Sequence, residues 1–367
     1  MKVLFVNREN AFTRLGGDTV QMVETKESLK KLGVQVDIAL GVQDESTYSK
    51  YDIIHVFNIQ TEDFTLEECK KIKKCNKRLY VSTIWWDFST NHINLNLNLN
   101  KLSTKDKIAK AILGKKLYVK LKENRSKKFN SKRFEKIKEI LDLADILLPN
   151  SKMELDSLNN NFNNDYSKKS YVVYNGINLE KYCGKEEMPK ELKDNSFKSR
   201  EYVLQVGRIE DIKGTLETIK ACNEFNLPLV IVGKAADDSY MQLCEEEAKN
   251  GKVYFAGLKN TDELVPFYRN ARVHALPSLR ETPGLVSIEA GYCGCQIVST
   301  IEGSTKEYFK DLVYYCDPVK YDSIRDGIYN AWYNGKDINA LKSLIKDEYN
   351  WDNAASQTLK AYNVISE

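Results

Sequence analysis

The chain contains little of what metal sites, exported proteins and membrane spans require. It has three histidines among 367 residues, and they form neither an H-E-x-x-H motif nor a C2H2 spacing. No Asp-x-Asp pair occurs either, so we expect no protein-bound metal. No segment approaches the roughly eighteen apolar residues that a membrane-spanning helix needs. The apolar run after Lys2 is also too short for the core of a signal peptide.

Cysteine pairs at metal-binding or redox spacing are absent as well. None of the eight cysteines forms a C-x-x-C pair, so we expect reduced thiols in a cytoplasmic protein. Cys293 and Cys295 are interpreted as small core residues rather than ligands. The net charge of +3 gives no overall attraction to polyanions, and the length favours two domains over one.

Short apolar segments alternate with helical patterns in both halves of the chain. In the first half these segments are residues 2–7, 34–40, 52–59, 79–85, 144–151 and 171–178. After a polar stretch the pattern restarts, with segments at 202–207, 227–233, 252–257, 272–278, 296–300 and 313–318. The alternation predicts two α/β domains, each built on a doubly wound parallel sheet. Ligands bind such sheets beyond the carboxyl ends of the strands, so we expect a site in a cleft between the domains.

A basic insert interrupts the first half between residues 88 and 138. It begins with NLNLNLN (94–100), which is interpreted as a surface segment or an edge strand. Over residues 101–138, fifteen Lys or Arg residues stand against three acidic ones, a local net charge of +12. Between these cations, apolar residues recur at helical spacing: Ile108, Ile112, Leu113, Leu117 and Leu121.

Such a basic amphipathic helix suits an anionic membrane surface or an anionic acceptor. In that case the protein would sit peripherally on the inner face of the plasma membrane. The alternative is a solvated basic helix that packs its apolar stripe on the domain. Nucleic acid is not expected, because few aromatic residues interleave with the charges and no nucleic-acid motif accompanies them.

The loop after the segment 202–207 carries two cations. Gly207, Arg208 and Lys213 occupy the carboxyl end of the first strand of the second half, just before a helix that begins near Thr215. An anion commonly sits at this point of a doubly wound sheet. A planar guanidinium and an ammonium together suit a diphosphate, although surface cations near a turn are also common.

The stretch RETPGLVSIEA, residues 280–290, carries two glutamates in an otherwise helix-like run. Gly284 follows a proline, and the pair predicts a helix that begins near Leu285. The free amides of Gly284, Leu285 and Val286 would then form a phosphate cradle. Glu281 and Glu289 would flank this cradle, since five helical residues rise about 7–8 Å. Carboxylates accept hydrogen bonds from sugar hydroxyls, so the arrangement fits a nucleoside-diphosphate sugar.

These motifs resemble the donor domain of the retaining GT-B glycosyltransferases of family 4. That family shows G-R-x4-K-G, matched by Gly207-Arg208 and Lys213-Gly214, and P-S-x-x-E-x-x-G-L-x-x-x-E-A, matched from Pro277 to Ala290. The resemblance covers nearly the whole chain outside residues 88–130. It implies two Rossmann-like domains that face an interdomain cleft. The acceptor domain would comprise residues 1–180 with the closing helix 351–367, and the donor domain residues 198–350.

The resemblance also implies a role for each matched residue of the second domain. Arg208 and Lys213 would bind the donor diphosphate and stabilise its charge as it leaves. Glu281 would contact hydroxyls of the transferred sugar, and Glu289 would hold the ribose. The amides at the start of the helix near Leu285 would help to seat the phosphate and the sugar.

Two positions of the first domain complete the expected site. Gly17 would allow a loop to approach the donor. Asp87 follows Trp85 and Trp86, where many relatives carry His-Asp, so Trp86 replaces the usual histidine and is interpreted either as a sugar-stacking face or as a core residue.

The expected activity is therefore a retaining, metal-independent transfer of a hexose-type sugar from a UDP- or GDP-linked donor. No cofactor is expected beyond this co-substrate. The acceptor would be a hydroxyl of a glycan, lipid-linked if the basic insert binds membrane, in the synthesis of a surface polysaccharide or glycoconjugate. The alternatives are another GT-B enzyme, such as a sugar-nucleotide epimerase or a phosphorylase, and an inactive glycan-binding or scaffold subunit.

Overall fold

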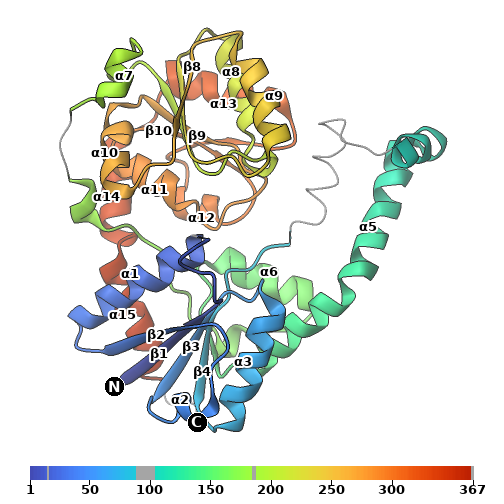
Figure 1. The fold of residues 1–367 in the computed structure, drawn as a ribbon, viewed down its shortest axis with the longest axis vertical. Coiled ribbons are helices and arrows are strands. Elements are labelled where there is room, and N and C mark those ends of the chain that lie inside the picture. Colours follow the sequence, from blue (N-terminus) through green and yellow to red (C-terminus); the bar gives the residue numbers. More distant parts are fainter. Residues whose placement is uncertain (15, 88–103, 184–186, 365–367) are drawn as a thin grey trace. The chain divides into compact units, whose positions relative to one another are not determined.

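A computed structural model describes residues 1–14, 16–87, 104–183 and 187–364, which form two compact units (Figure 1). Unit 1 comprises the described residues of Met1–Ser89, Ser103–Gly176 and Tyr349–Glu367. Unit 2 comprises those of Ile177–Glu348. The final helix of the chain thus belongs to the same unit as its first strand.

Unit 1 is built on one parallel sheet of five strands. In chain order they are β1 (Lys2–Asn7), β2 (Gln35–Leu40), β3 (Ile53–Phe57), β4 (Arg78–Ser82) and β5 (Ile146–Leu147). Their spatial order is β2-β1-β3-β4-β5, so the direction of winding reverses between β1 and β3. Because loops leave the sheet on opposite sides at such a reversal, a ligand-sized space opens beyond the strand ends there.

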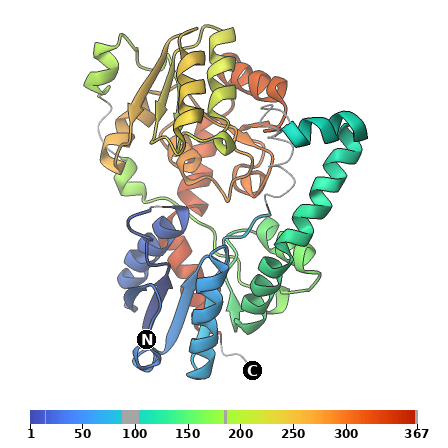
Figure 2. The same ribbon diagram turned by 45° about the vertical axis from the view of Figure 1, so that its right-hand side comes forward.

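Helices cover both faces of this sheet because its strands are apolar on both sides. On one face lie α1 (Gly17–Lys31) and α15 (Trp351–Tyr362), which pack against each other. On the other lie α3 (Glu62–Lys74), α6 (Lys152–Phe162) and the last part of α5 (Thr104–Leu143). The earlier part of α5 extends away from the sheet (Figures 1 and 2).

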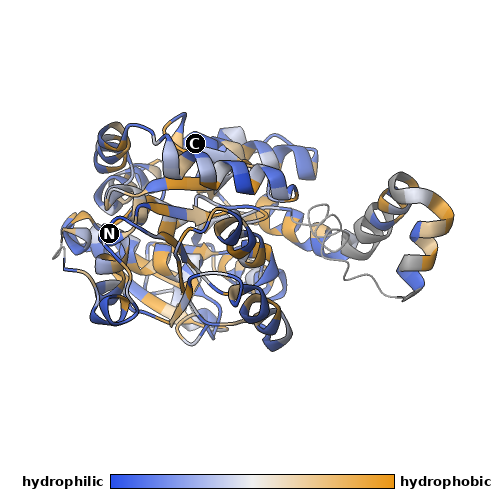
Figure 3. Ribbon diagram, turned by 90° about the horizontal axis from the view of Figure 1, so that it is seen from above, coloured by the Kyte–Doolittle hydropathy of each residue, from blue (hydrophilic) through white to orange (hydrophobic). Residues whose placement is uncertain are grey.

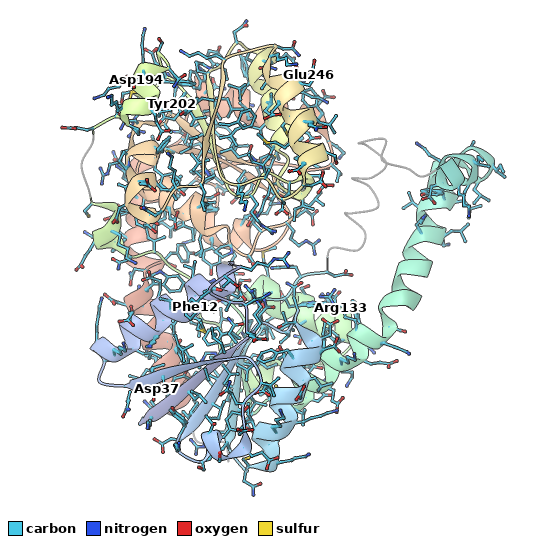
Figure 4. The ribbon with its side chains drawn as sticks, in the orientation of Figure 1. Phe12, Asp37, Arg133, Asp194, Tyr202 and Glu246 are labelled. Atoms are coloured by element: carbon cyan, nitrogen blue, oxygen red, sulfur yellow. The ribbon has the colours of Figure 1, made fainter. Side chains whose placement is uncertain are left out.

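Arg133 marks the point at which α5 joins the rest of the unit (Figure 4). Its Nε lies 3.3 Å from Glu62 Oε2 on α3, and its guanidinium lies over the Trp85 ring. The predicted helix in the basic insert is thus confirmed from residue 104 onward. The expected edge strand at 94–100 lies outside the described residues.

Unit 2 contains a parallel sheet of six strands. They are β6 (Val203–Val206), β7 (Leu229–Val232), β8 (Val253–Gly257), β9 (Val273–Leu276), β10 (Gln296–Thr300) and β11 (Tyr314–Cys316). The spatial order β11-β10-β9-β6-β7-β8 is that of a Rossmann sheet, with the first strand in the middle. The winding reverses between β6 and β9, which pair with each other.

Two sets of helices enclose the unit 2 sheet. One face packs on α8 (Thr215–Glu224), α9 (Asp238–Ala248) and α13 (Tyr321–Tyr333). The other packs on α10 (Thr261–Asn270), α11 (Leu285–Tyr292) and α14 (Ile338–Glu348). The prediction of two doubly wound parallel-sheet domains is confirmed.

One predicted strand, residues 171–178, is wrong. The amides of Tyr171 and Val173 donate to Leu147 O at the end of β5 and to Pro149 O just after it, but the amide of Tyr174 donates to the Gln357 side chain on α15. The segment therefore pairs with the end of β5 at its start, and at Tyr174 it is tied to a helix instead. The alternation of apolar and polar residues fits a segment with one more buried and one less buried side. Such a segment needs no continuous ladder of backbone hydrogen bonds.

Two glycines bring the ends of β6 and β7 into direct contact. A Cβ atom on Gly233 would lie 1.8 Å from the carbonyl oxygen of Gly207, and Gly233 has a φ of +154°. The Gly207 amide donates to Val232 O, and the Ile209 amide donates to Lys234 O. The loop that carries Arg208 therefore keeps its path because no side chain is present at residue 233.

Gly233→Ala is expected to lower the free energy of unfolding by about 3 kcal/mol or more, because the backbone must move to admit the new atom. The matched control is Gly257→Ala at the end of β8. Gly257 also has a positive φ, +70°, but no atom lies within 4 Å of the added Cβ. The control therefore carries only the left-handed backbone cost of about 1–2 kcal/mol. Chemical denaturation measures both values, and equal losses would contradict the close contact.

Candidate active site

The loop after β6 places Arg208 and Glu210 side by side. Ile209 bridges to Ala235 in an extended conformation, so its two neighbours project to the same side. Arg208 Nη2 lies 2.9 Å from Glu210 Oε1, with the arginine 55% exposed and the glutamate 14% exposed. Burial raises the pKa of Glu210, and the positive charge of Arg208 opposes the shift. The arginine thus presents its guanidinium outward from a half-buried carboxylate.

Lys213 and Glu281 form an ion pair across the reversal of the unit 2 sheet. The distance from Lys213 Nζ to Glu281 Oε1 is 2.7 Å, and the two side chains are 22% and 10% exposed. Lys213 follows β6 and Glu281 follows β9, the two strands between which the winding reverses. A backbone hydrogen bond from Leu279 N to Ile212 O, 2.8 Å, ties the two loops together. The structure thus brings together two residues that the sequence predicts for one site.

The backbone of Glu281 is fixed by the loop after β10. The Glu281 amide donates to Glu302 O, and the Ser304 amide donates to Glu281 O at 3.0 Å. Between these bonds lies Gly303, where a Cβ atom would come within 2.0 Å of the Glu281 carbonyl oxygen. The position of the carboxylate therefore depends on three strand-end loops, those after β6, β9 and β10.

The predicted helix at Leu285 is confirmed, and it starts beside the Glu281 carboxylate. Gly284 precedes α11 with a φ of +84°, and a Cβ atom there would lie 3.4 Å from Glu281 Oε2. The amides of Ser287 and Ile288 donate to Gly284 O. The amides of Leu285 and Val286 come before this first helical bond, so they remain available to an acceptor at the positive end of the helix.

Glu289 lies one turn further along α11 and is half-buried. Its Oε2 accepts a hydrogen bond of 2.7 Å from the hydroxyl of Tyr268 on α10. Burial raises the pKa of Tyr268 well above its ordinary value, with the Glu289 charge as a further cause, so the phenol stays a donor. No pattern in the sequence indicates this partner, because Tyr268 lies in the apolar pattern of its own helix.

The reversal in unit 1 gathers a second polar cluster. Arg8 follows β1, and its Nε and Nη2 lie 3.1 and 3.2 Å from the two oxygens of Asp18 at the start of α1. Asn58, after β3, donates to the same carboxylate at 3.4 Å. A Cβ atom on Gly16 would lie 2.6 Å from Asp18 Oδ1, whereas one on Gly17 meets no atom within 4 Å. The open side at Gly17 is compatible with its predicted role, which stays a prediction.

The segment before Asp87 is more buried than a sugar-stacking role for its tryptophans requires. Trp85 is fully buried, and Trp86 is 5% exposed. Trp85 contacts the rings of Phe134 and Phe162. The structure therefore favours the interpretation of Trp86 as a core residue. Asp87 is half-buried at the end of this segment, and its role stays a prediction.

A buried glutamate, which the sequence reading missed, holds this segment in place. Glu154 Oε1 accepts hydrogen bonds from the Thr83 hydroxyl and from the Trp85 amide, the latter at 2.8 Å. Its Oε2 accepts from the Asn150 amide at 2.9 Å. Burial raises the pKa of Glu154 to about 7, against these three hydrogen bonds, which favour the ionised form.

Other features bear on the site only by their positions. In the part of the chain that the structure describes, no group of three His, Cys, Asp or Glu residues is placed to hold a metal ion. Among the same residues, no helix is both long and apolar enough to cross a bilayer.

A surface cavity of about 490 Å³ lies near the amino ends of β9 and β10, between Arg200, Arg272 and Lys342, and so at the opposite edge of the sheet. The Arg200 guanidinium there donates to the carbonyls of Ala271 and Gly294.

The sequence of unit 2 matches a known family. Residues 187–351 match the model of the family described as glycosyl transferases group 1. This span contains Arg208, Lys213, Glu281 and Glu289, all of α11 and the sheet that carries them. The resemblance to the group 1 glycosyltransferases is thus confirmed.

Curated relatives match about half of the chain. An uncharacterised glycosyltransferase of Methanocaldococcus jannaschii is 31% identical over 216 residues, which is 54% of this chain and 55% of that protein. D-inositol 3-phosphate glycosyltransferase of a Mycobacterium species is 28% identical over 54% of this chain and 44% of that protein. O-antigen chain mannosyltransferase B of Escherichia coli is 27% identical over 45% and 46%. The chain thus spans about half the length of the curated relatives it matches.

Solved structures match over almost the whole chain. Sucrose-phosphate synthase from Thermosynechococcus elongatus has a TM-score of 0.69 at 15% identity and covers 98% of both chains. HepE from Anabaena, solved in complex with UDP-glucose, has a TM-score of 0.69 at 14% identity and covers both chains completely. At such low identity these matches bear on the fold, which is GT-B.

Replacement of Glu154 is expected to change how stability depends on pH. The folded-state pKa of Glu154, about 7, lies above its ordinary value of 4.5, so the folded chain holds this proton more tightly than the unfolded chain. Its contribution to stability is therefore complete below pH 4.5 and is lost as the pH rises to about 7. The slope reaches at most about 1.4 kcal/mol per pH unit.

Glu154→Gln should lack this slope, so the difference between the unfolding free energies of the two proteins should vary across that pH range. His55 and His274 titrate in the opposite sense, because burial lowers the pKa of each to about 3. Both histidines are common to the two proteins, so the difference isolates Glu154. Parallel curves from urea denaturation would show that the carboxylate stays ionised in the folded state.

Proposed function

We propose that the protein is a retaining glycosyltransferase that transfers a hexose-type sugar from a nucleoside-diphosphate sugar to a hydroxyl of a glycan. The observation that carries the proposal is the Lys213–Glu281 ion pair beside the first amides of α11. A cation, a carboxylate and free backbone donors meet there at the reversal of a Rossmann sheet, which is where such folds bind nucleotides.

Each group suits one part of the donor. The Leu285 and Val286 amides, with Lys213 and the exposed guanidinium of Arg208, suit the diphosphate. Glu281, next to the helix start, suits a hydroxyl of the sugar that the diphosphate carries. Glu289 lies further along the same helix, and Tyr268 holds one of its oxygens, which leaves the carboxylate oriented toward the ribose hydroxyls.

Donor binding should rearrange the charges of the site. Each cation is ion-paired before the donor arrives, Arg208 with Glu210 and Lys213 with Glu281. The diphosphate competes with Glu281 for the ammonium of Lys213. A carboxylate released from Lys213 is free to accept a hydrogen bond from the sugar. Correct placement of the phosphate and correct placement of the sugar are in this way coupled.

In the transfer itself, the bond between the anomeric carbon and the phosphate oxygen breaks, and the bond to the acceptor oxygen forms on the same face. The acceptor hydroxyl loses its proton to the departing phosphate oxygen. Lys213, Arg208 and the helix amides stabilise the charge that develops on the diphosphate. No metal is needed for this scheme. Asp87 and Gly17, in unit 1, are the proposed contributions to the acceptor side and to donor closure.

UDP is the proposed carrier, since the structurally similar HepE was solved with UDP-glucose. The named activity of one curated relative, O-antigen chain mannosyltransferase B, supports an acceptor in surface polysaccharide synthesis. A lipid-linked acceptor is the proposal that fits the basic insert. An epimerase would convert the free donor without an acceptor, and a scaffold subunit would bind the donor without turnover.

Glu281→Gln is expected to separate donor binding from transfer. Turnover should fall by roughly 10²–10³-fold, the usual effect of removing one interaction that acts in the transition state. Affinity for UDP should stay the same or rise, because Lys213 loses its charged competitor. Calorimetric titration with UDP and a product-release assay with UDP-glucose, GDP-mannose and related donors give the two quantities.

The matched control for this experiment is Glu302→Gln. Glu302 forms an ion pair of similar length, 2.8 Å, with Arg280. It accepts from the Glu281 amide through its backbone carbonyl, which the substitution keeps. It should leave both UDP affinity and turnover within a few-fold of the parent protein. Equal effects of the two substitutions, or weaker UDP binding by Glu281→Gln, would remove Glu281 from the proposed role.

Retention has its own test. An α-linked donor should yield an α-linked product, because the bond forms on the face from which the diphosphate leaves. Proton NMR of the anomeric signal during the first turnovers reads the configuration directly. A β-linked first product would contradict the proposed course of the reaction, even with the donor site intact.

A further inference from the structure

The start of helix α5 forms a folded tip, residues 104–122. Helical geometry is broken at Gly114, which has a φ of +72°. Asp106 Oδ1 and Lys122 Nζ lie 2.7 Å apart, although residues that far apart in sequence would be separated by about 24 Å along a straight helix. The chain therefore turns back on itself at Gly114. Tyr118 is buried inside this turn.

The outer surface of the tip is apolar to an unusual degree. Ile108 and Ile112 are 56% and 77% exposed on the first segment, and Leu117 and Leu121 are 48% and 40% exposed on the second. Each pair has a spacing of four residues and so lies on one side of its helix. Figure 3 shows orange, apolar segments of the ribbon at the far end of α5. Exposed apolar residues elsewhere are mostly scattered, which is ordinary, whereas a cluster marks a contact surface.

Cations surround this apolar surface. Lys105 and Lys120 are exposed, and Lys110 is partly exposed. The carboxylate of Asp106 is engaged by Lys122. Among the described residues, Lys105, Lys110 and Lys120 form no ion pair with a carboxylate. The tip thus presents apolar side chains and uncompensated positive charge together. The alternative interpretation, a stripe packed on the domain, does not hold for these four exposed residues.

We propose that this tip docks the protein onto a bilayer of anionic phospholipid, with Ile108, Ile112, Leu117 and Leu121 inserted among the headgroups. Two features favour lipid over a protein groove. Insertion removes all four side chains from water at once, and the lysine stems let the ammonium groups stay at the level of the phosphates. The charge is complementary to anionic lipid, which attracts each nearby cation.

The proposal stands apart from the sugar chemistry. Vesicle binding needs neither donor nor acceptor, so it is measured on the full chain without substrate. If transfer to a soluble acceptor occurs and vesicle binding fails, only the docking proposal is lost. If the protein binds vesicles but transfers no sugar, only the catalytic proposal is lost.

Co-sedimentation with vesicles tests the proposal. The protein should bind vesicles of equimolar phosphatidylcholine and phosphatidylglycerol, and bind phosphatidylcholine alone at least about tenfold more weakly. Ile112→Ser combined with Leu117→Ser should lower the partition coefficient by about tenfold or more. Lys105→Gln combined with Lys120→Gln should lower it about fivefold for each lysine, the equivalent of about 1 kcal/mol per cation, and should weaken its dependence on salt.

Leu243→Ser is the matched control. Leu243 lies on a helix, α9, and is 49% exposed, close to the value for Leu117, but it belongs to unit 2. It should leave vesicle binding unchanged. Binding that ignores lipid charge, or that the apolar double substitution leaves intact, overturns the proposal. A tip that mediates self-association would also overturn the proposal. That outcome would be seen as a dimer that does not bind vesicles and that the same double substitution dissociates.

Discussion

The ion pair between Lys213 and Glu281 is the interaction around which unit 2 is arranged. It joins the loops after β6 and β9, the only two neighbouring strands of this sheet between which the winding reverses. Its geometry relies on backbone contacts that exclude side chains, at Gly233 beneath the β6 loop and at Gly303 against the Glu281 carbonyl. The path of three loops thus fixes one carboxylate beside the start of α11.

This arrangement keeps charged groups ready without leaving them unpaired. A half-buried lysine or glutamate alone would incur a desolvation cost, which its partner in the ion pair offsets. Under the proposed function, a diphosphate would replace the carboxylate as the partner of Lys213, and a sugar hydroxyl would replace the ammonium as the partner of Glu281. In this proposal the site exchanges one set of paired interactions for another, and a ligand with both a phosphate and a hydroxyl would satisfy both residues.

Local patterns predicted the strands and the residues that follow them, because a buried parallel strand is an apolar run and a nucleotide site lies at its carboxyl end. Two residues that hold parts of the site, Tyr268 and Glu154, were not predicted. They come from helices whose own sequences give no reason to expect these contacts. The side-by-side placement of Arg208 and Glu210 could have been predicted, since alternate residues of an extended loop project to one side. The strand predicted at residues 171–178 is wrong because the segment pairs with β5 only at its start and then packs beside α15. The turn at Gly114 was not predicted, because the helical spacing of apolar residues continues on both sides of it.

The proposed function requires the donor to bind at the start of α11. A crystal structure of the protein with UDP tests this most directly. We expect phosphate oxygens within hydrogen-bonding distance, about 3 Å, of the Leu285 and Val286 amides, with Lys213 turned from Glu281 toward the diphosphate. UDP bound at another place, with the Lys213–Glu281 pair intact, would overturn the proposed donor site.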